Sequence, residues 1–113
     1  MTIQTSNVTS SGTTVYTSSG NSVVTFLSLT NYTANTVSAN VHIVPNNGGS
    51  VGNANVQNLA IVSLDIVSNG TSTGDTYQFY VGNEKLVLAN NDTIQVVANA
   101  DNSINAIVSY TGA

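Results

Sequence analysis

The sequence predicts an all-β fold, an antiparallel β-sandwich of jelly-roll type with seven or eight strands. Apolar and polar residues alternate along most segments, which is the pattern of strands with one buried face. Clusters of Gly, Asn and Ser separate these segments at spacings of about ten residues. No stretch combines helical periodicity with a helix-forming composition. The 113 residues leave no room for two cores, so we expect a single domain over residues 1–113.

Residues 37–44 show the alternation most clearly. Their odd positions are apolar, and their even positions up to His42 are polar, so we expect a strand with its odd side chains facing the core. Pro45 cannot donate to a ladder, and turn residues follow it, so the strand should end there. Upstream, we expect a short strand over residues 13–17. The continuous apolar centre of residues 22–31 predicts a longer strand that is buried on both faces.

The second half of the chain continues in the same way. Residues 58–67 predict an apolar strand interrupted near Ser63, and short strands should follow the loop at 69–75. These short strands are expected over residues 77–81 and 84–88. Residues 93–99 and 103–110 flank only three residues, so we expect a closing β-hairpin. Its inward side chains should be Ile94, Val96, Ala98, Ile104, Ala106 and Val108.

Residues 1–12 have only Ile3 and Val8 to bury. They should form either an edge strand or an N-terminal arm that lies on a neighbouring subunit. Tyrosine suits half-buried strand positions at a rim. We therefore expect Ile3, Val8 and Tyr16 to contribute to an interface.

Charge is nearly absent from this chain. Charged residues make up 5% of it, with one cation, five acids and a net charge of −4, against about 25% charged residues in ordinary domains. A nucleic-acid partner is therefore excluded, because phosphate contacts need clustered Lys and Arg. The chain has no cysteine, so disulfides and thiolate sites are excluded. It lacks the apolar runs of a secretory signal or a membrane span, so we expect a soluble product without a membrane partner.

The candidates for chemistry are few. His42 is the only histidine, and its parity places it on the outer face of a sheet, where a satisfied or exposed side chain is expected. Sites with two or three histidines are impossible. The acids Asp75, Glu84, Asp92 and Asp101 stand at strand ends or in turns, where Asp bonds to nearby backbone. A calcium loop and a glycosidase pair remain as lesser alternatives.

Two further patterns are weighed in the same way. The glycine-rich run at 48–52 lacks the lysine and the following helix of a phosphate loop, so we expect a loop between strands. The five tyrosines could form a sugar-stacking platform, but half-buried core or interface positions fit them better. The sequence therefore predicts no catalytic residue, no cofactor and no metal site.

Several short motifs follow one another in a characteristic order. Thr13-Thr14-Val15-Tyr16-Thr17 comes first, and Leu27-Ser28-Leu29-Thr30-Asn31 closes the next strand. Leu86-Val87-Leu88 leads through Asp92-Thr93-Ile94 to the final Val108-Ser109-Tyr110. Over residues 13–111 this series resembles the small β-sandwich virion proteins of tailed phages, especially marine ones. The stretch from 48 to 76 is longer than in that family, which leaves open which virion surface is bound.

The resemblance implies a capsid decoration protein or a tail, neck or fibre module, with no catalytic residues to carry over. We therefore expect a non-enzymatic virion protein that decorates the outer surface of a phage head. Its expected partners are copies of itself, as a homotrimer, and the major capsid protein or other virion proteins. A tail, neck or fibre component is the alternative within this class. From a different class, a carbohydrate-binding module is the main rival. It should show exposed aromatic residues beside clustered Asn or Asp.

Overall fold

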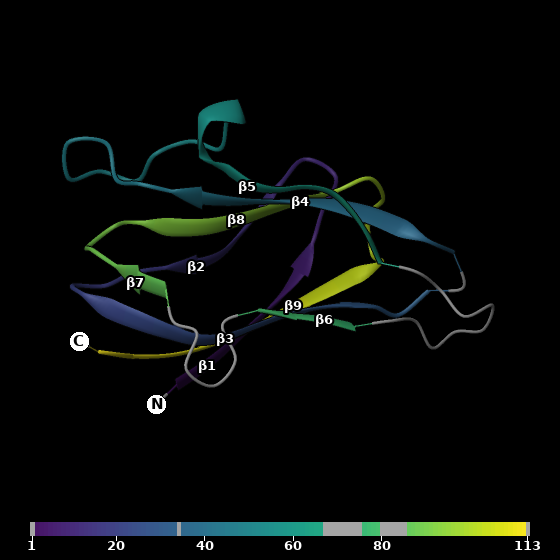
Figure 1. Ribbon diagram of the computed structural model, residues 1–113, viewed down its shortest axis with the longest axis horizontal. Helices are drawn as coiled ribbons and strands as arrows, with labels where there is room; N and C mark the ends of the chain where they lie inside the picture. The colour runs from purple at the N-terminus through teal and green to yellow at the C-terminus, as the bar shows by residue number, and fades with distance from the viewer. Residues whose placement is uncertain (1, 34, 67–75, 80–85, 113) are drawn as a thin grey trace.

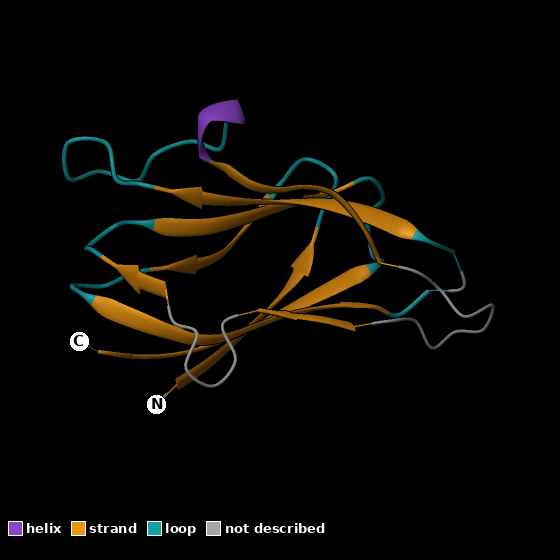
Figure 2. Cartoon of the chain, in the orientation of Figure 1, coloured by secondary structure: helices purple, strands orange, loops and turns teal. Residues whose placement is uncertain are grey.

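Two antiparallel sheets face each other in the computed structural model, which describes residues 2–33, 35–66, 76–79 and 86–112 (Figures 1 and 2). Sheet A has the order β1-β9-β3-β6, with β7 beside the other end of β3, and sheet B has the order β2-β8-β4-β5. The strands are β1 (Thr2–Val8), β2 (Thr13–Thr17), β3 (Ser22–Asn31), β4 (Val37–Val44), β5 (Leu59–Ile66), β6 (Thr76–Phe79), β7 (Leu86–Leu88), β8 (Thr93–Ala98) and β9 (Ile104–Gly112). A short 3-10 helix, η1 (Val56–Asn58), precedes β5.

The strand pairs are nested. β1 pairs with β9, β2 with β8, β3 with β6, and β4 with β5, and every pair is antiparallel. This nesting is the arrangement of a jelly roll, in which a long folded ribbon wraps into two sheets. The predicted fold class is therefore confirmed. The described residues form nine strands rather than seven or eight, because the N-terminal segment is an edge strand of its own sheet and not an arm.

The predicted hairpin over residues 93–110 is wrong. β8 pairs with β2 and β4 in sheet B, whereas β9 pairs with β1 and β3 in sheet A. The intervening turn therefore crosses from one sheet to the other. Alternation could not distinguish the two cases, because strands in facing sheets both turn their apolar side toward the same core. The inward set is nevertheless confirmed, since all six predicted side chains are at most 3% exposed.

Two irregularities explain the less regular sequence patterns. β3 has a register shift between Val24 and Phe26 against β9, so the buried positions change from Val24 to Leu27 and Leu29. The continuous apolar centre of this strand thus reflects a β-bulge. Leu27, Ser28 and Leu29 are buried in succession, which confirms the expected burial on both faces at the centre of the strand, whereas Phe26 is half-buried. In β5 the register against β4 shifts between the pairs at Ile61 and Leu64, which confirms the predicted interruption near Ser63.

Strand β8 offers a direct test of the core. Val96 is 0% exposed between the sheets, while its neighbour Val97 is half-buried and on the opposite parity. Val96→Asp should lower the free energy of unfolding by several kcal/mol, because it buries a lone carboxylate in a domain whose stability is about 5–15 kcal/mol. Val97→Asp should lower the free energy of unfolding by only a small fraction of that amount. Urea unfolding measures both. Equal midpoints for the two variants would contradict this assignment of the core face.

Candidate functional site

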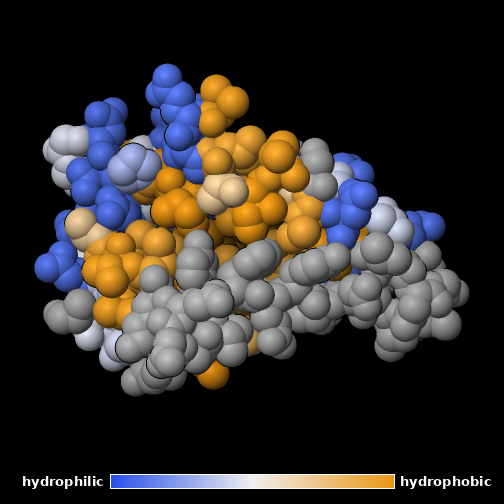
Figure 3. Space-filling view, viewed as in Figure 1, coloured by the Kyte–Doolittle hydropathy of each residue, from blue (hydrophilic) through white to orange (hydrophobic). Residues whose placement is uncertain are grey.

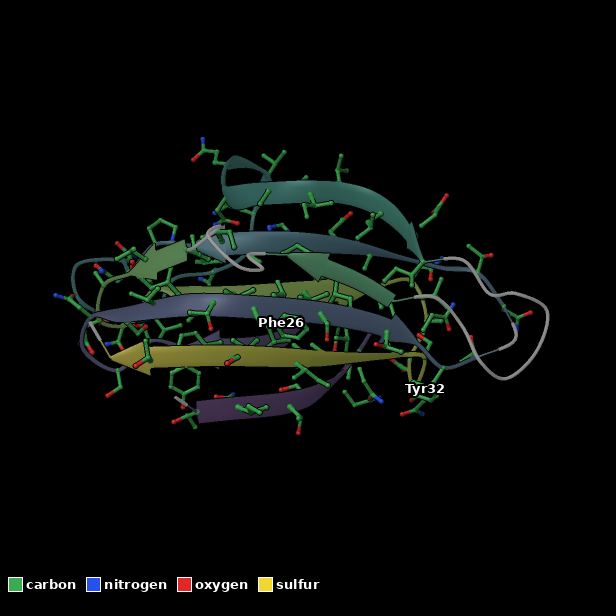
Figure 4. The ribbon with its side chains drawn as sticks, turned by 60° about the horizontal axis from the view of Figure 1, so that its bottom comes forward. Phe26 and Tyr32 are labelled. Atoms are coloured by element: carbon green, nitrogen blue, oxygen red, sulfur yellow. The ribbon has the colours of Figure 1, made fainter. Side chains whose placement is uncertain are left out.

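The outer face of sheet A carries three rows of uncharged side chains across β1, β9 and β3. The strand register forms these rows, because directly paired residues point to the same side of a sheet. The rows are Ile3-Ser109-Phe26, Thr5-Ile107-Ser28 and Asn7-Asn105-Thr30. Figure 4, which brings this sheet forward, labels Phe26 on β3 and Tyr32 just beyond the end of that strand. We call these nine residues the sheet A face; it is most open along β1, where Ile3, Thr5 and Asn7 are exposed, and least open at β3, where Ser28 is 4% exposed.

Apolar side chains stand among the hydroxyls and amides of the sheet A face. Ile3 is 67% exposed, and Phe26 and Ile107 are half-buried. A hollow of about 290 Å³ lies beside β1 and is lined by Thr5, Ser6, Asn7, Asn105 and Ile107. A face of this kind can pack against another protein, because few strongly solvated groups must lose water.

One end of the sheet A face is fixed by amide hydrogen bonds. The Asn7 Nδ2 atom donates to Asn105 Oδ1 at 3.0 Å and to the Tyr32 hydroxyl at 2.9 Å. The bonds join β1, β9 and the loop after β3. No sequence pattern indicates this cluster, because its three residues lie far apart in the chain.

The three residues predicted for an interface lie in different places. Ile3 is on the surface, on the sheet A face. Val8 is 0% exposed and lies opposite Ile104 in the core. Tyr16 is 2% exposed, its hydroxyl donates to Ser22 Oγ at 2.8 Å, and its ring centre is 4.4 Å from that of Tyr110. Val8 and Tyr16 thus pack within the chain itself, which leaves Ile3 as the exposed member.

His42 lies on the outer side of sheet B, as its parity predicts, and is only 7% exposed. The loop between β4 and β5 covers it. The Nδ1 atom lies 3.1 Å from the Asn55 carbonyl oxygen and 2.9 Å from Asn58 Oδ1. Both partners are acceptors, because Asn58 Oδ1 also accepts from the Asn55 backbone N–H, so Nδ1 carries a proton. His42 thus holds the η1 loop against β4.

Asp92 connects three loops at one end of the sandwich. Its Oδ1 accepts from the Asn46 backbone N–H at 2.7 Å, and its Oδ2 accepts from the Ala89 N–H at 2.8 Å. Its carbonyl accepts from the Ser18 N–H at 2.9 Å. This is the structural turn role predicted for the acids.

The remaining acids add no shared site among the residues that the structure describes. Asp65 is exposed on β5, and Asp101 bonds to a neighbouring turn. Asp75 and Glu84 lie outside the described residues. Within the described ranges, no three His, Asp or Glu side chains are grouped as a metal ion would require.

The glycine-rich loop after β4 is built from tight turns. Gly48 and Gly49 have positive φ, and Asn47 and Ser50 bond to each other through their backbones. Beside it lies a hollow of about 290 Å³, lined by Val44, Pro45, Asn46, Asn47, Gly52, Asn53, Asn55 and Asn58. Several of these amides are engaged in the loop itself, since Asn46, Asn55 and Asn58 all bond to nearby backbone. The side chains of Tyr77 and Tyr80 are not among those described.

The side of the sandwich between β5 and β7 also exposes apolar atoms. Figure 3 shows orange side chains gathered there, over the gap between the sheets. Val62 on β5 and Val87 on β7 are 64% and 67% exposed.

Comparisons with known proteins assign the chain to no family. No protein-family model matches the chain, and no curated protein matches it. Among the described residues, no helix has the length and apolar character needed to cross a membrane. The geometry of the surfaces is therefore the basis for a functional proposal.

Asp101 provides a pH-dependent test of the turn contacts. The Ser10 backbone N–H donates to its Oδ1 at 2.6 Å. This bond, aided by the Ser10 side chain, lowers the pKa of Asp101 below its ordinary value of 3.8. The stability gained from this contact is complete above the ordinary pKa and is lost as the pH falls through the pKa of the folded state.

We expect Ser10→Pro to return the pKa of Asp101 toward its ordinary value. The Gly12 N–H donates to the Thr9 carbonyl, so residue 10 is the second position of a turn, where proline fits but has no N–H. Ser10→Ala keeps that donor and should preserve most of the lowering. Carboxyl NMR titration measures both. A pKa unchanged by the proline would show that the backbone bond is not the cause.

Proposed function

We propose that this chain is a non-enzymatic structural protein of a virion, one that decorates the outer surface of a phage head. The observation that carries the proposal is the sheet A face, on which three adjacent strands present outward side chains that are all uncharged. Ile3 and Phe26 supply apolar contacts on this face, and its hydroxyls and amides supply hydrogen bonds.

The physical reason is the low cost of covering such a surface. Removing an ion from water costs far more than removing a hydroxyl or amide that regains a hydrogen bond. Protein interfaces are accordingly depleted in charge at their centres. The nine residues of the sheet A face include no acid and no lysine, so these side chains can meet a neighbour without leaving a charge unpaired.

Of the described acids and the histidine, all but the exposed Asp65 are already engaged in the fold. His42 clamps a loop, and Asp92 and Asp101 accept from backbone N–H groups. This supports a binding role over catalysis. The partner we propose is the major capsid protein, and a tail, neck or fibre protein is the alternative surface in the same particle. The jelly roll itself occurs in both viral capsid and lectin domains, so it does not decide between binding roles.

Capsid co-sedimentation tests the proposal. Phe26→Asp and Ile3→Asp each place a charge on the sheet A face and should weaken binding to phage heads by at least about tenfold, which corresponds to about 1.4 kcal/mol. Val62→Asp is the matched control, because Val62 is 64% exposed on sheet B, close to the 67% of Ile3. Circular dichroism should show that all three variants remain folded.

Binding that persists in both sheet A variants, or that is lost equally in Val62→Asp, would contradict the assignment of this face. Wild-type protein that binds neither heads nor tails would contradict the virion proposal as a whole.

A carbohydrate-binding module is the second candidate, and the amide-lined hollow beside η1 favours it. Val44 and Pro45 provide an apolar part of this hollow, and asparagine side chains provide hydrogen-bonding groups. A glycan array tests it directly. Under the virion proposal the array should be blank. Glycan binding that is lost in Asn53→Ala but kept in Phe26→Asp would favour the carbohydrate-binding role instead.

A further inference from the structure

The sheet edges differ in how well they are protected from pairing with another strand. Of the described edges, β2 has five residues and a register shift, and β5 has two register shifts and carries Asp65. The far edge of sheet A is divided between β6, with four residues, and β7, with three. Bulges, short strands and charges are the devices by which proteins prevent edge pairing. All three of these edges are therefore protected from pairing with another strand.

β1 has none of these devices. It pairs with β9 over seven consecutive residues without a register shift. Its sequence, TIQTSNV, contains no charge and no proline. Thr2, Ile3 and Thr5 are exposed, so the N-terminal half of this edge is open to an approaching strand.

The hydrogen bonds near the end of β1 show which backbone groups face outward. The Asn7 carbonyl accepts from Thr13 Oγ1 at 3.5 Å, and the Thr9 N–H donates to the same atom at 3.0 Å. Both groups therefore point away from β9. Because backbone direction alternates along an antiparallel edge, Ile3 and Thr5 also direct their N–H and C=O groups outward.

We propose that two copies of this chain join through β1, each pairing antiparallel with the same strand of the other copy about a two-fold axis. A head-to-tail contact would need a second unprotected edge, and the other described edges are protected. A symmetric contact uses β1 twice. A symmetric contact also places the side chains of the strand near those of the same strand in the other copy. Because β1 has no charged residue, no like-charge repulsion opposes the pairing. The joined sheets A form one continuous sheet, and Ile3 becomes partly covered.

Sedimentation equilibrium of the purified chain tests this pairing without capsids, so its failure would leave the head-binding proposal standing. Wild-type protein should approach the mass of two chains as its concentration rises. Thr5→Pro should raise the dissociation constant at least about tenfold. It removes an outward N–H that the sheet of its own chain does not use, so the fold should be retained.

Thr5→Lys provides a second disruption that leaves the backbone unchanged. Both copies then carry a lysine on the short paired segment, so like-charge repulsion should weaken dimerisation, and added salt should partly restore it. Thr14→Lys is its control, since Thr14 is an exposed threonine on the protected edge β2. Phe26→Asp, two strands away from the edge, should dimerise normally even where it loses capsid binding.

Three results would overturn the proposal. A wild-type chain that stays monomeric at high concentration has no such contact. Dimerisation that survives both Thr5 variants uses another surface. A mass of three chains would show a trimer, the assembly expected from the sequence resemblance, which two-fold pairing through β1 cannot form.

Discussion

The layer of apolar side chains between the two sheets is the constraint on which the rest of the molecule depends. Every strand whose side chains are described contributes to it, from Val8 on β1 to Val108 on β9. These side chains must interlock at the density of an organic crystal, so each strand has to keep its inward parity. The outward parity carries weaker packing demands. That freedom allows three adjacent strands to present an uncharged surface in which hydroxyls and amides surround Ile3, Phe26 and Ile107.

Neutral side chains also perform the structural work that ion pairs do in other domains. Asn31 is 0% exposed at the end of β3, and its Nδ2 donates to the carbonyl oxygens of Asn35 and of Ile66 on the other sheet. It thus joins the two sheets without a buried charge, which would be costly to desolvate. A scaffold held in this way has little need of surface charge. The same use of neutral side chains in place of ion pairs leaves the faces of the fold suited to contact with other proteins.

Period-two alternation was enough to predict most strand positions and the inward set of β8 and β9. It cannot assign a strand to a sheet, because facing sheets share one core, and so it wrongly predicts a hairpin over residues 93–110. It also could not foresee the bulge at Phe26, or that the η1 loop would cover His42. The candidate face was predictable only through Ile3. Its other members come together through strand register, which depends on pairings between residues about seventy-five or more positions apart, such as Thr30 with Asn105.

The nesting of the strand pairs has a consequence for how the chain acquires its structure during synthesis. Thr2 pairs with Tyr110, and Val8 with Ile104, so β1 can pair with its neighbour only after synthesis has reached β9. β3, which lies between β9 and β6, also lacks one neighbour until that moment. Pairings this distant in sequence make folding slow and leave strand edges open meanwhile. A nascent chain with almost no charge has little electrostatic repulsion to keep it from its neighbours on a polysome, so open strand edges of neighbouring chains can pair before β9 has been made.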